Sequence, residues 1–319
     1  MATVISMRGE DVASNHEPEL SSAMEATVAK ADPPQKAAPV KARPALGARL
    51  GGMAGAAAAR LLPTLLMLVL FLGAWQIACQ DEGSALPAPS KIWTESHEVI
   101  VHPLKGVIFD AGGMHIDETG DVGVGGHILT SLQRVAYGFS LSVIFGVALG
   151  ILIGQSVFAY RALDPLFQIF RTVPPLAWLP ISLAIFQQAG PSAVFLIFIT
   201  AIWPIILNTA AGVQNIPETY RNVGRVLALS PIEYFRKIML PATVPHMFTG
   251  LRIGIGMSWL AIVAAEMVQG GTGIGFFIWD SYNSSLLTDT IVALIWIGLV
   301  GFTLDRIVGW IGNRVARQA

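Results

Sequence analysis

The sequence predicts an all-α integral membrane protein with six transmembrane helices and short cytoplasmic helices. Three observations lead to this fold class. The chain of 319 residues is 53% hydrophobic and 13% charged, with a mean hydropathy of +0.60, whereas soluble domains carry about 25% charged residues. Six apolar stretches approach the roughly 20 residues that cross a bilayer as a helix. Lysine and arginine residues gather on one side of these stretches.

The six apolar stretches follow one another from residue 61 to near the end of the chain. Backbone groups in lipid must be hydrogen-bonded within their own segment, so each stretch is expected to be a helix. Pro174, Pro175 and Pro180 interrupt the third stretch, where we expect a break that neighbouring elements repair. The stretches comprise residues 61–79, 128–154, 165–186, 193–212, 248–268 and 291–311.

Residues 1–55 differ in composition from the rest of the chain. They are rich in Ala, Pro, Glu and Lys, and they lack apolar periodicity. We interpret them as a disordered cytoplasmic extension that folding does not require, with a functional tail as the alternative. The first apolar stretch lies too far from Met1 for a signal peptide. Residues 56–319 are assigned to the transmembrane domain.

The distribution of Lys and Arg orients the spans. With the N-terminus in the cytoplasm, nearly all of the positive charge falls in the inside segments, and the outer loops hold only Lys91 and Lys105. The positive-inside rule therefore predicts that both termini are cytoplasmic. The net charge of −1 gives no reason to expect nucleic acid as a partner.

A charged segment of helix separates the fourth and fifth apolar stretches. Ser230 and Glu233 have the spacing of a capping box, with Pro231 at the first helical position. The helix that they start is expected to end near Leu240 and Pro241, after about ten residues, because proline breaks a helix interior.

A second short helix is expected to open at Pro217. Its apolar residues fall on one face and its basic residues on another; these are Tyr220, Val223 and Leu227, and Arg221 and Arg225. Helices this short are marginal in water and need a surface to pack on. The surface is either the lipid headgroups, which the arginines would face, or a groove on a partner protein. The residues alone leave both alternatives open.

Ionisable residues inside the apolar stretches are candidates for function, since charge in lipid is costly. Arg171 lies beside the double-proline break, where it either bonds the carbonyls that the prolines free or attracts an anion. Arg134 and Glu266 are expected near the outer surface, where they can pair. Arg252 is expected near the inner interface, reaching water along its own stem.

Other features carry weaker signals. The tryptophans, Trp178 among them, are interpreted as interface anchors and packing residues. A single cysteine, Cys79, excludes an intrachain disulfide, and the sequence lacks the G-x-x-x-x-G-K-[ST] motif of a nucleotide-binding loop. The outer loop carries histidines and aspartates without a diagnostic metal spacing, so we expect a solvated loop, with a metal site as the alternative. These residues are His97, His102, His115, His127, Asp110, Asp117 and Asp121.

The charged segment resembles a known family motif. The stretch NVGRVLALSPIEYFRKIMLP, residues 222–241, is similar to the EAA loop of permease subunits in bacterial ABC importers. In that family Glu-Ala-Ala is followed after three residues by Gly, and after nine more by Ile-x-Leu-Pro. Ala228 stands at the glycine, the triplet is replaced and the ending is intact. The positions concerned are Asn222, Val223 and Gly224, and Ile238, Leu240 and Pro241.

The resemblance covers about residues 60–315 and is closest to the nitrate-type branch of the nitrate, bicarbonate, sulfonate and taurine permeases. It is carried by LPAPSKIW, RALDPLFQIFRTVPPLAWLPISLAIFQQ, TGLRIGIGMSWLAIVAAEM and GIGFFIWDSYNSS. It implies a type I ABC importer permease fold and import of a small anion, nitrate or nitrite first, with bicarbonate, cyanate, sulfonate or taurine as alternatives. Outside the family, an ATPase-independent secondary transporter or channel and a membrane enzyme remain as alternatives.

The resemblance also implies partners and sites. In such importers a pair of permeases, here a homodimer, grips cytoplasmic subunits that bind ATP and Mg²⁺, and an extracytoplasmic solute-binding protein delivers the solute at the bacterial inner membrane. The chain itself would bind no cofactor or metal and hold no catalytic residue. The coupling loop, residues 214–246, would contact the ATPase through Asn222, Val223, Gly224, Arg225, Ala228, Ser230, Pro231, Glu233, Ile238, Leu240 and Pro241. The substrate pathway would include Arg171, Pro174, Pro175, Trp178 and Glu266.

Overall fold

The computed structural model describes residues 46–81, 83–110, 113–116 and 122–317. The chain divides into two compact units, residues 1–67 and 68–319, and of the first unit only the beginning of α2 is described. Most of the predicted extension, up to residue 45, lies outside the described residues. Residues 46–55 are helical rather than disordered, since the adjoining alanine run favours helix.

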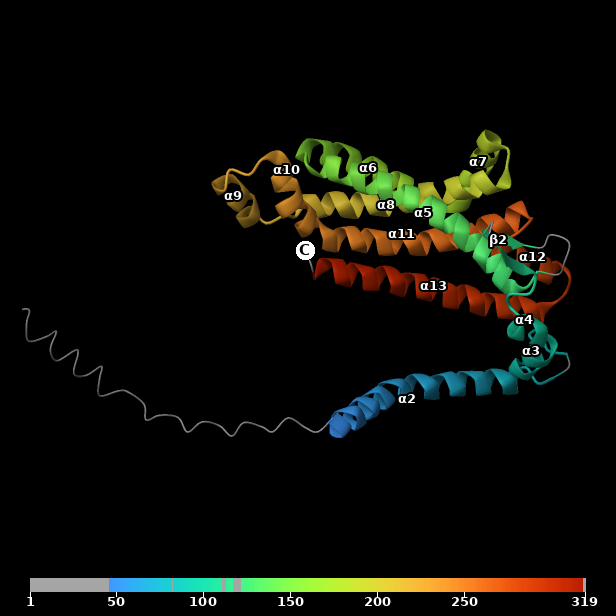
Figure 1. Cartoon of the computed structure of the whole chain (residues 1–319). Helices are drawn as coiled ribbons and strands as arrows, with labels where there is room; N and C mark the ends of the chain where they lie inside the picture. Colours follow the sequence, from blue (N-terminus) through green and yellow to red (C-terminus); the bar gives the residue numbers. More distant parts are fainter. Residues whose placement is uncertain (1–45, 82, 111–112, 117–121, 318–319) are drawn as a thin grey trace, which may run out of the picture. The chain divides into compact units, whose positions relative to one another are not determined.

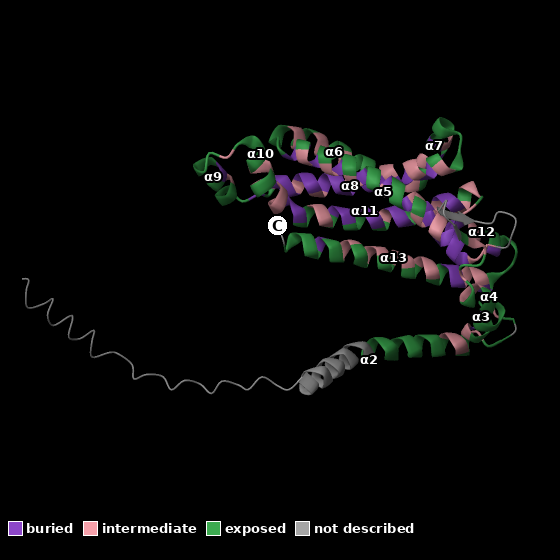
Figure 2. Ribbon diagram, viewed as in Figure 1, coloured by how far each residue is buried: buried purple, intermediate pink, exposed green. Residues whose placement is uncertain are grey.

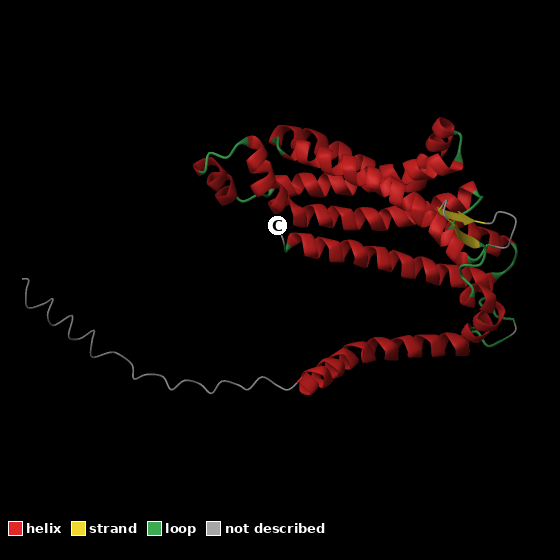
Figure 3. Ribbon diagram, in the orientation of Figure 1, coloured by secondary structure: helices red, strands yellow, loops and turns green. Residues whose placement is uncertain are grey.

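The regular elements of the described chain are helices and one short β-hairpin, joined by loops and turns (Figure 3). The elements are α2 (Leu46–Ala78), α3 (Pro89–Glu95), α4 (His97–Val101), β1 (Val107–Asp110), β2 (Gly113–Ile116), α5 (Val124–Gly154), α6 (Val157–Thr172), the 3₁₀ turn η1 (Pro175–Trp178), α7 (Leu179–Phe186), α8 (Ala189–Gln214), α9 (Glu218–Val226), α10 (Pro231–Tyr234), the π-helical turn η2 (Phe235–Met239), α11 (Leu240–Gln269), α12 (Ile274–Asn283) and α13 (Leu287–Ala316). The antiparallel hairpin, which pairs Val107 with Ile116, was not predicted.

Four helical segments within the described residues are long and apolar enough to cross a membrane. They are α5, α8, α13 and the continuous run Pro231–Gln269 that contains α11. The bent pair of α6 with η1–α7 makes a fifth if it is one span, and α2 contributes a shorter apolar helix, Leu62–Ala78. These segments coincide with the six predicted stretches, so the all-helical membrane class is confirmed.

The third predicted span is not one helix. The segments on either side of the double proline are bent by 94°. Val173 and Pro174 are extended, with ψ of 121° and 137°, because a residue that precedes proline avoids the helical region. Pro180, which was expected to add to the break, lies in the first turn of α7, where a missing amide donor is tolerated.

The helix α8 forms the centre of the bundle. It packs against α5 and α11, and much of its length is buried (Figure 2). α5 presents a row of small residues to α8 at every fourth position: Gly138, Ser142, Gly146, Gly150 and Gly154. Such rows let two helices in lipid approach closely and gain van der Waals contact.

Gly146 tests this packing directly. A Cβ at this position would lie 2.8 Å from Cγ2 and 3.0 Å from Cβ of Ile205. Gly146→Val should therefore force α5 away from α8 and destabilise the bundle by about 1–3 kcal/mol. Gly256→Val is the matched control, because a Cβ on Gly256 meets nothing within 4 Å. Thermal unfolding in detergent measures both variants, and equal midpoints would contradict the packing role.

Two polar contacts join α11 to α13. Trp259 Nε1 donates to the Ile297 carbonyl at 3.0 Å. Arg252 forms a bidentate pair with Asp305, in which Nη2 lies 2.6 Å from Oδ2. Arg252 was expected to reach water alone, but it pairs with a carboxylate on the neighbouring span. The two residues are 53 positions apart, so their spacing in the sequence gives no sign of the pair.

The two ends of the bundle carry different elements (Figure 1). The short helices α9 and α10 lie at one end of α8 and α11, whereas α12 and the hairpin lie at the other. The charged segment and the Arg134–Glu266 pair are therefore at opposite ends of the spans, as their predicted positions on the two sides of a membrane require.

Candidate functional site

The charged segment between α8 and α11 contains a tight turn. α9 ends at Val226 with Leu227 as its C-cap, and the chain turns at Ala228, whose φ is +46°. The Ala228 amide donates to the Arg225 carbonyl at 3.0 Å, and the Leu229 amide donates to the Gly224 carbonyl at 3.1 Å. This pair of bonds is a Schellman motif, whose turning residue is usually glycine. The position that the EAA motif fills with glycine is thus a left-handed one, which Ala228 adopts here.

The predicted capping box is confirmed at the start of α10. Ser230 Oγ accepts a hydrogen bond from the Glu233 amide at 3.3 Å, and Glu233 Oε2 accepts one from the Ser230 amide at 3.1 Å. Glu233 also pairs with Lys237, one turn later, at 3.1 Å. The cap fixes the beginning of the helix two residues after the turn.

The capped helix does not end at Leu240 and Pro241, as was predicted. The π-helical turn η2 leads directly into α11, and in it the Leu240 amide donates to the Phe235 carbonyl, five positions back. This wider turn accommodates Pro241, which has no amide donor and would clash with a regular preceding turn. The capped segment and the fifth span are consequently one continuous helix, Pro231–Gln269.

Gly224 is buried where α9 meets the capped helix. A Cβ there would lie 2.8 Å from the Tyr234 ring and 3.2 Å from Ile238. On its other side, α9 is tied to the end of α8, because Arg221 Nη2 donates to the Gln214 carbonyl at 3.0 Å. Both contacts hold α9 in place, and neither was predicted from the sequence.

One face of the charged segment is apolar and uncovered. Its exposed side chains are Tyr220, Val223, Val226, Leu227 and Ile232. A groove of about 340 Å³ adjoins them, lined by Tyr220, Val223, Lys237, Ile238, Pro241 and Ala242. Exposed apolar rows on short, anchored helices are typical of a surface that another protein covers.

Arg171 lies in the last turn of α6, directly before the double-proline bend. It is exposed, and it makes no hydrogen bond or ion pair with any residue that the structure describes. The adjacent Phe170 stacks on Trp203 with ring centroids 5.2 Å apart, and Trp203 lies near the middle of α8. Arg171 is therefore level with the middle of the bundle. Within the described part of the chain, Arg171 makes no bond to the carbonyls that the prolines free, so the first of its two predicted roles has no support there.

Trp178 lies on the other side of the bend. It belongs to η1, and its ring centroid is 6.3 Å from that of Phe170. It packs beside Leu179 and Leu196, both nearly inaccessible to solvent. Trp178 thus joins the two halves of the bent pair through apolar contact.

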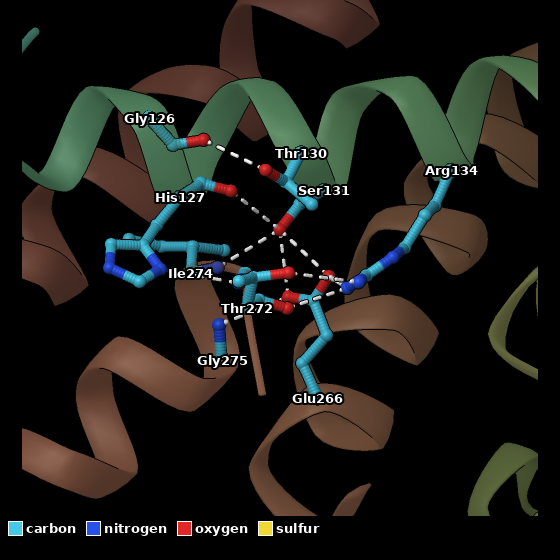
Figure 4. A network of polar contacts seen from close by, with 10 residues as sticks. Gly126, His127, Thr130, Ser131, Arg134, Glu266, Thr272, Ile274 and Gly275 are labelled. Carbon is cyan, nitrogen blue, oxygen red and sulfur yellow. Dashed lines mark hydrogen bonds and ion pairs between the residues drawn. The ribbon is translucent and has the colours of Figure 1, made fainter. Parts of the chain in front are cut away.

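A buried polar network occupies the opposite end of the bundle (Figure 4). The Glu266 side chain is 1% exposed and accepts hydrogen bonds from Arg134 Nη1 at 2.7 Å and Ser131 Oγ at 2.7 Å. The expected pairing of Arg134 with Glu266 is confirmed. The Gly275 amide donates to the same carboxylate at 3.2 Å, and Arg134 also donates to the Thr272 carbonyl at 2.6 Å.

The glycine-rich turn before α12 is shaped by this network. Gly273 has a φ of +129°, and a Cβ there would lie 2.1 Å from the Glu266 carboxyl carbon. A Cβ on Gly275 would lie 2.0 Å from the Val263 carbonyl oxygen. The glycines therefore let the backbone close over a buried carboxylate, and the Gly273 amide donates to His127 Nδ1 at 3.2 Å.

The described residues contain no group of three His, Cys, Asp or Glu side chains able to hold a metal ion. Two aspartates of the outer loop, Asp117 and Asp121, lie outside the described residues, as do the side chains of Asp110 and His115. His127 lies in the polar network instead, where its ring is 5.3 Å from that of Phe277.

These features define a multi-pass membrane protein whose fourth and fifth spans are joined by short, anchored helices. The chain belongs to the family described as the inner membrane component of binding-protein-dependent transport systems, whose model matches residues 145–317. Members of this family are permease subunits of ABC importers, so the chain is a transport subunit and not an enzyme.

Two relatives and one solved structure are similar to the chain. It is 56% identical over 248 residues to the nitrate import permease protein NrtB of Synechocystis sp., covering 78% of this chain and 86% of that protein. It is 48% identical over 251 residues to the bicarbonate transport system permease protein CmpB of Synechococcus elongatus, covering 78% and 87%. The inward-facing MetNI methionine ABC transporter matches with a TM-score of 0.50 and 17% identity, over 59% of this chain and 93% of that chain, which supports the type I permease fold.

Proposed function

We propose that the chain is the permease subunit of an ATP-driven importer that moves a small anion, nitrate or nitrite, into the cytoplasm. The observation that carries the proposal is its 56% identity over 248 residues to a nitrate import permease. Arg171 adds physical support, because it has no ion-pair partner among the described residues and lies level with the middle of the bundle. Its charge would attract an anion that gives up hydration on entering a low-dielectric passage.

The ATPase contact lies on the loop of residues 214–246. Its uncovered apolar face suits a protein partner better than headgroups, which would favour exposed charge. Since the capped helix continues into α11, a push on this loop moves the fifth span with it. The contact residues are those that the motif aligns: Asn222, Val223, Gly224, Arg225, Ala228, Ser230, Pro231, Glu233, Ile238, Leu240 and Pro241.

The working assembly contains two copies of this chain, two ATP-binding subunits that hold ATP and Mg²⁺, and an extracytoplasmic solute-binding protein. It resides in the bacterial inner membrane with both termini cytoplasmic, in agreement with the Lys and Arg distribution. Residues 1–55 form a cytoplasmic extension of the permease domain, 56–319.

The substrate pathway passes the bend at Arg171, with Pro174 and Pro175 opening the backbone there and Trp178 as its apolar wall. Glu266 was assigned to the same pathway from the sequence. Its burial and its hydrogen bonds from three donors, Ser131, Arg134 and the Gly275 amide, favour a structural role at the outer end instead.

The decisive experiment measures ATP hydrolysis and isotope uptake by the reconstituted complex with its binding protein. We expect nitrate and nitrite to stimulate hydrolysis and to be accumulated, with sulfonates inactive. Accumulation of a sulfonate or of no small anion would contradict the proposal, and accumulation without an ATPase subunit would favour a secondary transporter.

Bicarbonate is the second candidate substrate, because a bicarbonate transport permease is 48% identical over 251 residues. Uptake of labelled bicarbonate in the same vesicles, with nitrate as competitor, separates the two. Stimulation by bicarbonate alone would replace nitrate as the substrate without changing the class of transporter.

A pair of substitutions tests the coupling loop. Gly224→Val would drive a side chain into the Tyr234 ring, 2.8 Å from a Cβ, and displace α9 at a local cost of about 1–3 kcal/mol. We expect ATP hydrolysis to continue while uptake falls. Ala228→Gly, the control, relieves about 1 kcal/mol of left-handed strain and should keep uptake coupled. Normal uptake per ATP in Gly224→Val would show that the loop does not transmit force.

A further inference from the structure

Four polar side chains of α6 lie on one stripe of the helix, called here the polar stripe. Arg161, Asp164, Gln168 and Arg171 follow one another at spacings of three, four and three positions, which places them on a single face. Arg161, Gln168 and Arg171 are exposed, and Asp164 is half-buried. An otherwise apolar membrane helix thus carries a continuous polar row.

The polar stripe is separate from the other two faces of α6. Tyr160, Leu163 and Phe167 pack against the apolar cluster formed with α5 and α8. A third face is apolar and exposes Phe158 and Ile169, which are 85% and 61% accessible. That third face suits lipid, so the polar stripe must be covered by something else.

The charged side chains of the polar stripe require contact with water. An arginine at the centre of a membrane helix costs about 2.5–3.5 kcal/mol, and Arg161, Gln168 and Arg171 have no hydrogen-bond partner among the described side chains. Water in a passage removes most of this cost. The stripe carries two arginines and one aspartate, a net charge of +1, so such a passage favours anions.

The length and position of the polar stripe match half of a transmembrane path. Ten positions separate Arg161 from Arg171, which is about 15 Å of helix against a hydrocarbon core of about 30 Å. One end of the stripe, Arg171, lies at the double-proline bend, level with Trp203 in the middle of α8. Its other end, Arg161, lies one turn from Val157, which lines a cavity of about 330 Å³ together with Tyr234 of the coupling loop.

We infer that the polar stripe lines the cytoplasmic half of the anion passage, with Gln168 and Arg171 together forming its binding step. The inference rests on the proposed function and assigns Gln168 a specificity-determining role. The Gln168 amide and the Arg171 guanidinium are one turn apart, so both can donate to the oxygens of one small monovalent oxyanion.

Asp164 gives the passage its release step. It lies one turn from Gln168 on the same face of α6, and its carboxylate repels an anion that has left the binding step. Conduction requires binding that is favourable enough to enter and weak enough to leave. Arg161, one further turn toward the coupling loop, draws the anion on to the cytoplasmic end.

Cysteine labelling tests the path independently of transport. The chain has one cysteine, Cys79, so Cys79→Ala provides a background for Gln168→Cys, Asp164→Cys and the lipid-face control Ile169→Cys. In the intact complex, a membrane-impermeant charged thiosulfonate added from the cytoplasmic side should label positions 164 and 168 about ten-fold faster than 169, because only a solvated thiol forms the reactive thiolate. Nitrate should slow labelling at 168. Equal rates at 168 and 169 would overturn the inference.

Uptake by Gln168 variants tests the binding step. Gln168→Leu removes the donors at similar volume and should lower nitrate uptake per assembled complex about ten-fold. Gln168→Asn should retain part of it, and Ile169→Leu should transport normally. Normal uptake by Gln168→Leu, in a parent complex that accumulates nitrate, would refute this inference and leave the proposed function standing. A parent complex that accumulates no small anion would refute both this inference and the proposed function.

Discussion

Arg171→Gln is expected to abolish most anion uptake while the complex still assembles. Arg171 has no neutralising partner among the described residues and stands level with the middle of α8, so its charge is available to an anion in a low-dielectric passage. Losing a charge-assisted contact of about 1.5–3 kcal/mol corresponds to a fall of about ten- to hundred-fold. Uptake in vesicles, normalised to assembled transporter, is the measurement.

Arg171→Lys is the conservative comparison. It keeps the positive charge and loses the planar fork, so partial uptake is expected. A brace for the double-proline bend predicts a different pattern: both substitutions would lower the yield and thermal stability of the complex, with activity per assembled complex unchanged. Normal normalised uptake by Arg171→Gln would exclude the anion role.

Glu266→Ala is expected to be the most destabilising of the substitutions considered. The carboxylate is 1% exposed, and removing it leaves Arg134 and the Gly275 amide without their partner in a buried site. Breaking a buried ion pair in this way costs about 3–5 kcal/mol. Thermal unfolding of the purified complex should show the loss, and uptake should fall in proportion to the protein that remains folded.

An exposed ion pair on the same side provides the control. Lys91 and Glu95 are 3.6 Å apart with side chains 60% and 49% exposed, so Glu95→Ala should cost about 1 kcal/mol or less. Glu266→Gln keeps the shape and part of the hydrogen bonding and should fall between the two. A Glu266→Ala variant as stable as Glu95→Ala would show that the network does not hold the outer end together.

Much of the fold was predictable because its signals are local. Runs of apolar residues mark the spans whatever surrounds them, and the Ser230–Glu233 spacing marks a helix start within one turn. The end of that helix was mispredicted, since Pro241 alone indicates a break and only the π-helical turn before it shows how the helix continues. A proline in the sequence shows which backbone hydrogen bond cannot form, but the surrounding residues determine the backbone conformation that replaces it.

The site was predictable in part for the same reason. Alignment with a known loop placed Ala228 at a glycine position, but its left-handed φ of +46° became visible only with the turn around it. The pairing of Arg134 with Glu266 was predicted because both residues were expected near the outer surface of the membrane. Ser131 and the Gly275 amide, which complete the hydrogen bonding of Glu266, are uncharged and were not predicted.

The sequence by itself determined the class of this protein: an apolar composition with little charge can be stable only across a bilayer, and positive charge on one side of the spans orients it. The tertiary structure decided which polar groups meet. Arg252 pairs with Asp305, 53 positions away, and Glu266 is enclosed by α5 and a glycine-rich turn. Arg171 has no hydrogen-bond or ion-pair partner among the described residues. Hydropathy is a property of each segment alone. The pairing of polar side chains depends on how the helices pack, and this packing involves residues far apart in the chain.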